Sequence, residues 1–233
     1  MDWFQVAHRE VETFFDTGQR ISEAERQRRG IAAVDAFHHV FSVIAVELGL
    51  QDAWPDPCCH IMPFSTGIIE RSRKLDVDFT MGVSLDGWFI EAPIGAPEQI
   101  RHMKDSYWQH IVRLSTIGKA ELQDYGRPPG WNSSPDVRRL TKHKSSLVFS
   151  IARDFTLLAS CPEGCTSLGN IHVVVPLEAD EAAVIEFFKL GLDSLYRSNY
   201  LLYRADYLRR RRHALNLPSN ASEPASNDAP KCA

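Results

Sequence analysis

The sequence predicts an α+β fold, in which a small mixed sheet lies between an N-terminal helical hairpin and a long C-terminal helix. Three observations support this prediction. Helix start and stop signals occur within residues 1–50, apolar and polar residues alternate over residues 75–81, and a long stretch with a helical apolar stripe follows Asp180. At 233 residues and 44% hydrophobic side chains, the chain can bury a proper core in one domain.

The helical hairpin is predicted from the first 50 residues. Residues 2–17 form a first helix that ends at Gly18. The sequence Ser22-Glu23-Ala24-Glu25 is a capping box, which opens a second helix ending at Gly49. Residues 1–50 are therefore expected to form two helices joined by a short connection.

A sheet-containing core is predicted over residues 60–178. The alternation over residues 75–81 indicates a half-buried strand, and residues 88–92 return as its hairpin partner after an Asp-Gly turn signal. Residues 147–160 and 171–175 are rich in β-forming residues and are predicted to be later strands of the same sheet.

Two further helices are predicted. From Pro97, apolar residues recur at three and four positions, which describes an amphipathic helix reaching roughly Gln123. Asp180 is expected to cap a final helix over residues 180–213, about 50 Å long, whose distal end projects beyond a small domain. Its predicted buried stripe is Val184, Phe187, Phe188, Leu192 and Leu195. Residues 217–233 have almost no apolar side chains and are predicted to be a disordered tail, which leaves residues 1–216 as a single domain.

Several features predict a cytoplasmic protein without a membrane segment. Met1–Phe4 combines an acid with aromatic residues where a secretory signal needs basic residues and then an apolar run. Ile31–Leu50 is long and apolar, but it contains charged and imidazole side chains, which favours a buried soluble helix. Five cysteines, of which Cys58 and Cys59 are adjacent, argue against a disulfide framework. The net charge of −4 gives no general attraction to nucleic acid, so such binding needs a local basic surface.

The predicted strand carries a pair of carboxylates. Asp76 and Asp78 are two residues apart, which on a strand places both on one face. A four-residue loop over residues 84–87 pairs Thr80 with Glu91 and makes Asp78 the diagonal neighbour of Glu91, at roughly 7–8 Å. A tight two-residue turn at Asp86-Gly87 would instead pair Gly82 with Glu91 and move Glu91 a further pleat away. Such oxygen ligands suit a hard divalent cation.

This arrangement resembles the core of restriction-endonuclease-like PD-(D/E)XK nucleases, over about residues 70–119. The shared features are an upstream helix with Glu70, a strand aspartate, a hairpin to Trp-Phe-Ile-Glu, and an amphipathic helix. The resemblance implies metal-dependent phosphodiester hydrolysis, with Mg²⁺ held by Asp78 (or Asp76) and Glu91 and with Glu70 or Asp76 assisting. The family's lysine, two positions after the glutamate, is Pro93 here. The chain is then a pseudonuclease, or a cation such as Lys74 or Arg73 substitutes.

Two alternatives involve the same aspartates. Phe64-Ser65-Thr66-Gly67 followed by Asp76-Val77-Asp78 is similar to the strand on which polymerase-β-like nucleotidyltransferases hold Mg²⁺ for phosphoryl transfer. The family's glycine before the serine is absent. In the other alternative, Asp76 and Asp78 lie on a solvent-facing surface and pair with Lys74 and Arg73.

Two other groups of residues have metal-ligand chemistry. Asp35, His38 and His39 fall at i, i+3 and i+4 on the second helix, where a hydrogen-bonded histidine is the commoner role. Thiols occur in two loops as Cys58, Cys59, Cys161 and Cys165, in a spacing that favours reduced thiols over a zinc site.

The final helix combines tyrosine with arginine. Tyr196, Tyr200, Tyr203 and Tyr207 recur at four, three and four positions, which places them on one stripe. The arginines of this segment are Arg197, Arg204, Arg209, Arg210, Arg211 and Arg212. Six arginines against Asp206 give the segment a charge of +5. This combination suits nucleic acid or a protein subunit interface, whereas a core-facing tyrosine stripe is the structural alternative.

The sequence therefore predicts a nucleic-acid-processing protein with a nuclease-like core, which is a Mg²⁺-dependent hydrolase if it is catalytic. The first alternative is a non-catalytic assembly or adaptor subunit that binds a protein partner, as a homo- or hetero-oligomer, through the Tyr/Arg helix. The second alternative is nucleotidyltransferase-like phosphoryl transfer on the Asp-x-Asp strand.

Overall fold

The structure, a computed structural model, describes residues 2–15, 23–55, 57–62, 64–123, 146–159 and 168–216. The helices are α1 (Trp3–Phe15), α2 (Glu23–Glu47), the 3₁₀ helix η1 (Pro97–His102), α3 (Asp105–Ile117), α5 (Leu147–Ala159) and α6 (Glu181–Asn216). The strands are β1 (Cys58–Met62), β2 (Ser65–Ser72), β3 (Val77–Ser84), β4 (Gly87–Pro93), β5 (Lys119–Gln123) and β6 (Asn170–Val175). The predicted tail, Cys161 and Cys165 lie outside the described residues.

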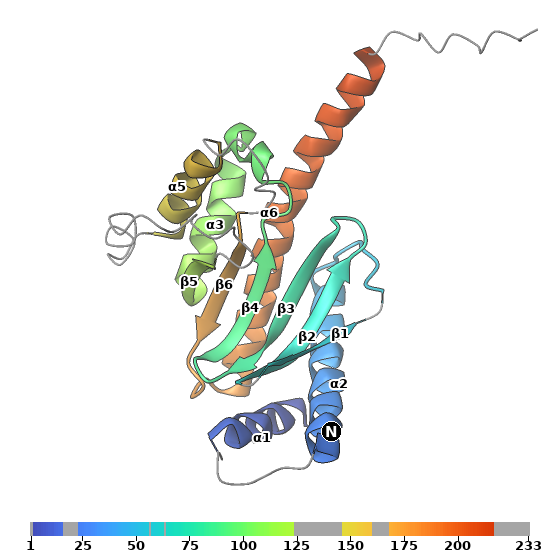
Figure 1. Ribbon diagram of the computed structural model, residues 1–233, viewed down its shortest axis with the longest axis vertical. Coiled ribbons are helices and arrows are strands. Elements are labelled where there is room, and N and C mark those ends of the chain that lie inside the picture. Colours follow the sequence, from blue (N-terminus) through green and yellow to red (C-terminus); the bar gives the residue numbers. More distant parts are fainter. Residues whose placement is uncertain are drawn as a thin grey trace, which may run out of the picture.

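The six strands form one sheet in the order β1-β2-β3-β4-β6-β5 (Figure 1). Every neighbouring pair is antiparallel, so the predicted α+β class is confirmed, but the described strands do not form a mixed sheet. The β3–β4 hairpin has the register predicted for a four-residue loop, with Val83 opposite Trp88 and Thr80 opposite Glu91.

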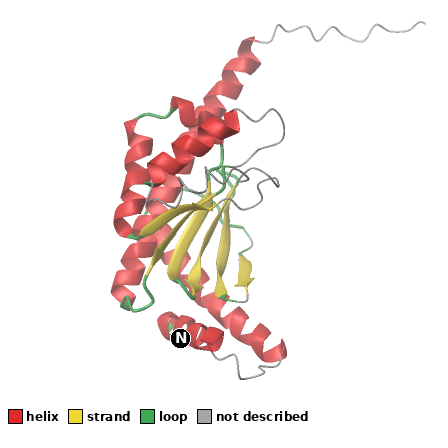
Figure 2. Ribbon diagram, turned by 60° about the vertical axis from the view of Figure 1, so that its left-hand side comes forward, coloured by secondary structure: helices red, strands yellow, loops and turns green. Residues whose placement is uncertain are grey.

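Alternation along the strands separates a core face from an outer face. Val77, Phe79, Met81 and Val83 of β3 are at most 3% exposed and point to the side of the sheet that carries α1, α2 and α6 (Figure 2). The intervening residues of β3 point to the outer face. Whether a strand side chain lies on the core face or on the outer face therefore depends on whether its place along the strand is odd or even.

An aromatic cluster joins three helices to the core face. Trp3 of α1, Phe37 of α2, Trp88 of β4 and Phe188 of α6 pack with ring centroids 5.8–6.5 Å apart. The Trp88 Nε1–H also donates to the carbonyl of Leu177 at 3.3 Å. Because the cluster contains one residue from each of α1, α2, α6 and β4, it fixes the three helices on the sheet.

The predicted C-terminal helix is confirmed as α6, which extends to Asn216, beyond the predicted end at 213. The Asp180 Oδ1 accepts a hydrogen bond from the Ala183 N–H at 2.8 Å, so Asp180 caps the helix as expected. All five residues of the predicted stripe, Val184, Phe187, Phe188, Leu192 and Leu195, are at most 4% exposed. The distal end of α6 extends beyond the rest of the described fold (Figure 1).

The prediction of a strand over residues 147–160 was wrong, because α5 spans Leu147–Ala159. Its buried residues are Leu147, Ile151 and Asp154, spaced by four and three, which is a helical period. This periodicity prevails over the β-forming character of the individual residues.

The predicted helix from Pro97 to Gln123 is also corrected. It divides into η1, α3 and the strand β5. The helix ends at Gly118, where a Cβ atom would lie 2.6 Å from the carbonyl oxygen of Val174 on β6. The close approach of β6 at this glycine starts the β5–β6 pairing.

The segment before residue 75, in which the nuclease resemblance implies a helix with Glu70, contains β1 and β2. Glu70 therefore lies on a strand. Asp76, predicted to be on a strand, lies in the β2–β3 turn with φ of 56°.

Candidate nucleic-acid interface

The predicted catalytic carboxylates are separated by the sheet. Glu70 pairs with Phe79 across β2 and β3 and shares its core-facing side, whereas Asp78 pairs with Arg71 on the outer face. Glu91 pairs with Thr80 and also points to the outer face. The described structure thus places Glu70 on the opposite side of the sheet from Asp78 and Glu91.

The two aspartates form ion pairs with Arg71. One guanidinium nitrogen, Nη2, lies 2.6 Å from Asp76 Oδ1, and Nη1 lies 3.2 Å from Asp78 Oδ1. The side chains of Asp76 and Asp78 are 81% and 46% exposed. This is the solvent-facing, ion-paired arrangement that the sequence left open, with Arg71 as the cation in place of Lys74 and Arg73.

Glu91 belongs to a different cluster on the outer face. Its Oε2 lies 3.1 Å from Nδ1 of His172 on β6. Phe89 packs between His172 and His60, with ring centroids 5.4 and 5.7 Å away. Burial and the nearby His172 lower the pKa of His60, although Glu91 opposes this shift. Glu91 is thus engaged on the β6 side of β4, away from Asp76 and Asp78.

These contacts do not fit a Mg²⁺ site. The carboxylate oxygens of Asp76 and Asp78 already face the guanidinium of Arg71, which repels a cation at the same place. In the described part of the chain, no three His, Cys, Asp or Glu side chains form a group able to hold a metal ion. We therefore derive no reaction step through Mg²⁺.

In the predicted histidine group on α2, His38 contacts a glutamate of the sheet. Nδ1 of His38 lies 2.6 Å from Oε1 of Glu70, while Asp35 and His39 are exposed. Cys58 and Cys59 are exposed on the edge strand β1. His38 thus acts as the hydrogen-bonded histidine that the sequence favoured, with a glutamate of the sheet as its partner.

Glu70 is a buried carboxyl group whose side chain is fully inaccessible to solvent. Among the described residues, its Oε2 has no hydrogen-bond partner. Burial raises the pKa of Glu70 above the ordinary value of 4.5, and the hydrogen bond to His38 only partly opposes this shift. A raised pKa in the folded state stabilises the fold below the unfolded value, and this stabilisation is lost as pH rises through the folded value.

We expect Glu70→Gln to flatten the pH dependence of stability. The wild-type free energy of unfolding should fall as pH rises above 4.5, relative to that of Glu70→Gln, whose neutral amide carries no ionisation penalty. Urea denaturation across this pH range measures the difference. Glu121→Gln, at an exposed position, serves as the control, and parallel curves for wild type and Glu70→Gln would contradict the prediction.

The tyrosines of α6 form a ladder that emerges from the core. Tyr196 is 6% exposed and packs near Trp54 and Phe79, with centroids 6.0 Å away in both cases. Ring centroids are 6.5 Å apart between Tyr200 and Tyr203 and 6.4 Å apart between Tyr203 and Tyr207. Tyr207 is 51% exposed. The stripe is therefore core at its first member and surface at its last.

Arginines lie beside the outer part of this ladder. Arg197, Arg204 and Arg211 are exposed and recur every seven residues, which is about two helical turns. Tyr200 and Tyr207 have the same spacing. We define the Tyr/Arg face of α6 as Arg197, Tyr200, Tyr203, Arg204, Tyr207 and Arg211.

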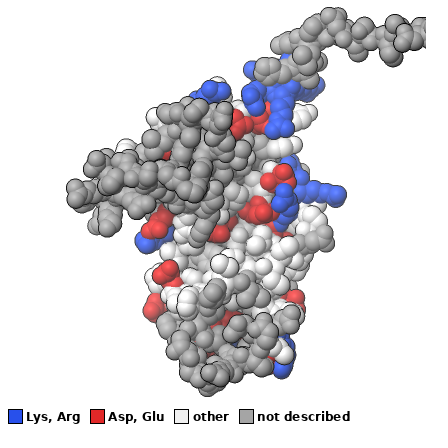
Figure 3. All heavy atoms as spheres, viewed as in Figure 1, with Lys and Arg blue, Asp and Glu red and all other residues white. Residues whose placement is uncertain are grey.

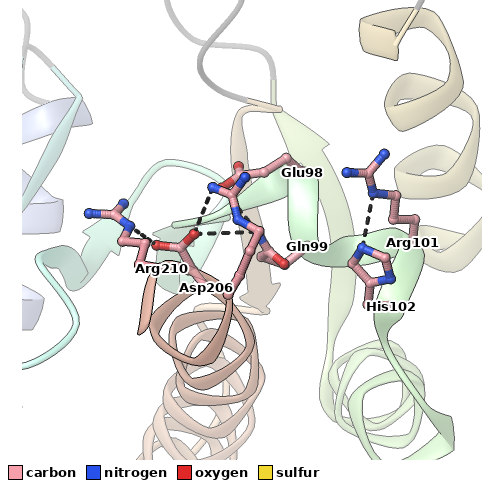
Figure 4. Close-up of polar contacts among 7 residues, drawn as sticks. Glu98, Gln99, Arg101, His102, Asp206 and Arg210 are labelled. Carbon is pink, nitrogen blue, oxygen red and sulfur yellow. Dashed lines mark hydrogen bonds and ion pairs between the residues drawn. The ribbon is translucent and has the colours of Figure 1, made fainter. Parts of the chain in front are cut away.

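Asp206 neutralises part of the arginine run. Its carboxylate accepts hydrogen bonds from Arg209 Nη2 at 3.1 Å and from Gln99 Nε2 of η1 at 3.3 Å, and it lies 2.6 Å from Arg210 Nε (Figure 4). Arg209 also lies 3.9 Å from Glu98. Asp206 thus ties α6 to η1 and engages Arg209 and Arg210.

The remaining arginines keep their charge available. Within the described ranges, Arg204, Arg211 and Arg212 are exposed and form no ion pair with a carboxylate. Figure 3 shows lysine and arginine atoms gathered at the far end of α6. A locally basic surface therefore exists on a chain with a net charge of −4.

Comparison with family models, with curated proteins and with solved structures gives no significant match. One helical segment, Gly30–Glu47, is long and apolar enough to cross a membrane, and 44% of it is buried within the fold. This is weak evidence for a membrane span, since the core helix of a globular protein can have the same length and apolar composition.

Proposed function

We propose that this protein binds single-stranded nucleic acid through the Tyr/Arg face of α6. The observation that carries the proposal is a seven-residue repeat of exposed arginines beside a tyrosine ladder that is partly buried at Tyr200 and exposed at Tyr207, on a helix that extends beyond the fold. Exposed tyrosine rings can stack on bases of any sequence, and guanidinium groups bind phosphates. Unpaired bases are accessible to such rings, which favours a single strand over a duplex.

The charge distribution favours a polyanion over a groove on a protein partner. Successive helix residues are about 100° apart, so Arg209 to Arg212 place basic side chains all around the helix axis, directly after the exposed Tyr207 and Leu208. A second copy of the chain docking face to face would bring Arg204 and Arg211 against like charges. A strand of phosphates is complementary to all of these positions.

The contacts of the carboxylates favour binding over hydrolysis as the function. Asp76 and Asp78 are engaged with Arg71, and Glu91 is engaged with His172. The proposed role is thus that of a nucleic-acid-binding subunit, which corresponds to the pseudonuclease among the alternatives that the sequence offers.

The test is fluorescence anisotropy of a labelled oligothymidylate at several salt concentrations. For Arg204→Gln combined with Arg211→Gln, we expect roughly tenfold or greater loss of affinity. The slope of log K against log salt should become less steep by about 1.4, which corresponds to about 0.7 per phosphate contact. The double variant Arg28→Gln with Lys119→Gln removes two exposed charges elsewhere and is the matched control. Equal binding by the two double variants would refute the proposal.

Tyr207→Ala tests the aromatic part of the face. Loss of one stacked base should cost about 1–3 kcal/mol of binding free energy, which is roughly 5-fold to 150-fold in affinity. Because Tyr207 is 51% exposed, its removal should change the free energy of unfolding by no more than about 0.5 kcal/mol. Tyr207→Phe keeps the ring and should bind like the wild type, whereas equal loss in both variants would indicate a role of the hydroxyl instead of stacking.

A further inference from the structure

A pocket of about 240 Å³ lies at the inner end of the Tyr/Arg face. The segment directly after α2 contributes Leu48, Gly49, Leu50 and Gln51, the β2–β3 turn contributes Lys74, and α6 contributes Tyr196, Arg197 and Tyr200. Arg197 and Tyr200 belong to both the pocket and the Tyr/Arg face. The two surfaces are therefore continuous.

Two cations line the pocket. The Lys74 ammonium lies 4.9 Å from the centroid of the Tyr200 ring, and in the described part of the chain it forms no ion pair with a carboxylate. Arg197 Nε lies 2.5 Å from Asp193 Oδ1, and Arg113 shares the other oxygen of Asp193 at 3.1 Å. Lys74, Arg197 and Arg113 against Asp193 and the nearby Asp52 leave a net charge of +1, so the pocket is cationic.

The rest of the lining is apolar and aromatic. Leu48 and Leu50 are partly buried against the core, and Tyr196 and Tyr200 add their rings. The nearest carboxylate behind Tyr196 is Asp52, which accepts hydrogen bonds from the Tyr196 hydroxyl at 3.0 Å, from the backbone N–H of Lys74 at 3.0 Å, and from Ser72 Oγ. Asp52 is thus occupied by protein donors, and its contacts hold the β2–β3 turn against α6.

A cationic rim around an aromatic and aliphatic lining fits a phosphate monoester whose sugar also carries a flat base, as in a terminal nucleotide. A monoester carries more negative charge than the diesters within a strand, so two cations at one place favour a strand end. We propose that this pocket binds the terminal phosphate of a nucleic-acid strand, whose following nucleotides run outward along the Tyr/Arg face. This inference rests on the proposed function and extends it by fixing where the strand ends.

The experiment compares oligothymidylates with a 5′-phosphate, a 3′-phosphate or no terminal phosphate, measured by anisotropy on the full chain. Phosphate at one end should raise affinity roughly tenfold or more. Lys74→Met should abolish that gain, so that the variant binds all three strands with the same affinity, whereas Lys74→Arg should retain most of the gain. Lys119→Met removes an exposed lysine outside the pocket and should keep the full gain.

The outcomes separate this inference from the proposed function. Equal affinity for all three strands, with binding still weakened by Arg204→Gln and Arg211→Gln, overturns the strand-end site and leaves the proposed function standing. Failure of all strands to bind overturns both. Thymidine monophosphate distinguishes a free nucleotide from a strand end: it should compete away only the gain from phosphate, and its binding without any gain for a phosphorylated strand overturns the strand-end assignment.

Discussion

Trp88→Ala is expected to lower the free energy of unfolding by about 3–5 kcal/mol, as for other fully buried large aromatic side chains. Trp88 is 0% exposed and is the point at which α1 and α6 meet β4. Phe4 stacks on it with an interplanar angle of 10° and a centroid distance of 5.1 Å. Its truncation leaves a cavity bordered by three elements, none of which can fill it alone.

Urea denaturation measures this loss, and Trp88→Phe separates its two causes. The phenylalanine ring keeps much of the apolar burial but removes the hydrogen bond to the Leu177 carbonyl, which is worth about 0.5–1.5 kcal/mol. Trp88→Phe should therefore cost clearly less than Trp88→Ala. If Trp88→Ala costs no more than replacement of a half-buried tryptophan such as Trp108, the aromatic cluster does not hold the helices to the sheet.

The elements that depend on local sequence could be predicted. The cap at Asp180, the apolar stripe of α6 and the tyrosine ladder all follow from residues within one or two helical turns of each other. For the β3–β4 hairpin, the sequence left two registers open, and the structure has the one expected for a four-residue loop. The Tyr/Arg face belongs to a single helix, so the spacing of its tyrosines and arginines in the sequence is enough to predict it.

The features that depend on pairing between distant segments could not be predicted. Pairing of β2 with β3 places Glu70 beside Phe79 and Arg71 beside Asp78, and a shift of one residue would exchange the two faces. The sequence contains no signal that selects one of these two β2–β3 registers over the other. For the same reason, the role of Arg71 and the partnership of Glu91 with His172 of β6 were missed.

The pocket could not be predicted either, because its lining residues lie far apart in the sequence. Lys74, Tyr200 and Leu48 come from three segments that the sequence does not relate to each other. Asp52 relates them physically, because its carboxylate accepts donors from β2, from the turn after it and from α6. A polar residue that joins distant segments gives no periodic signal, although a lone aspartate between a helix end and a strand is the kind of residue that can do so.

Gly82→Ala is expected to cost at least about 3 kcal/mol, at the upper end of overpacking effects. Gly82 of β3 faces Gly67 of β2, and a Cβ atom on Gly82 would lie 2.2 Å from the carbonyl oxygen of Thr66 and 2.7 Å from the Cα of Gly67. These are backbone atoms, which cannot rotate away as a side chain can. The β2–β3 ladder must therefore open to admit a single methyl group.

Gly49→Ala is the matched control, because it measures the cost of an unfavourable backbone conformation without the cost of a steric clash. Gly49 has φ of 62°, which costs an alanine about 1–2 kcal/mol, but an added Cβ meets nothing within 4 Å. The loss for Gly82→Ala in urea denaturation should thus exceed the loss for Gly49→Ala. The reverse order would mean that β2 and β3 separate easily at this point. Since the same two strands hold Arg71 and the Lys74 turn in place, easy separation would also remove the support that the proposed phosphate pocket requires.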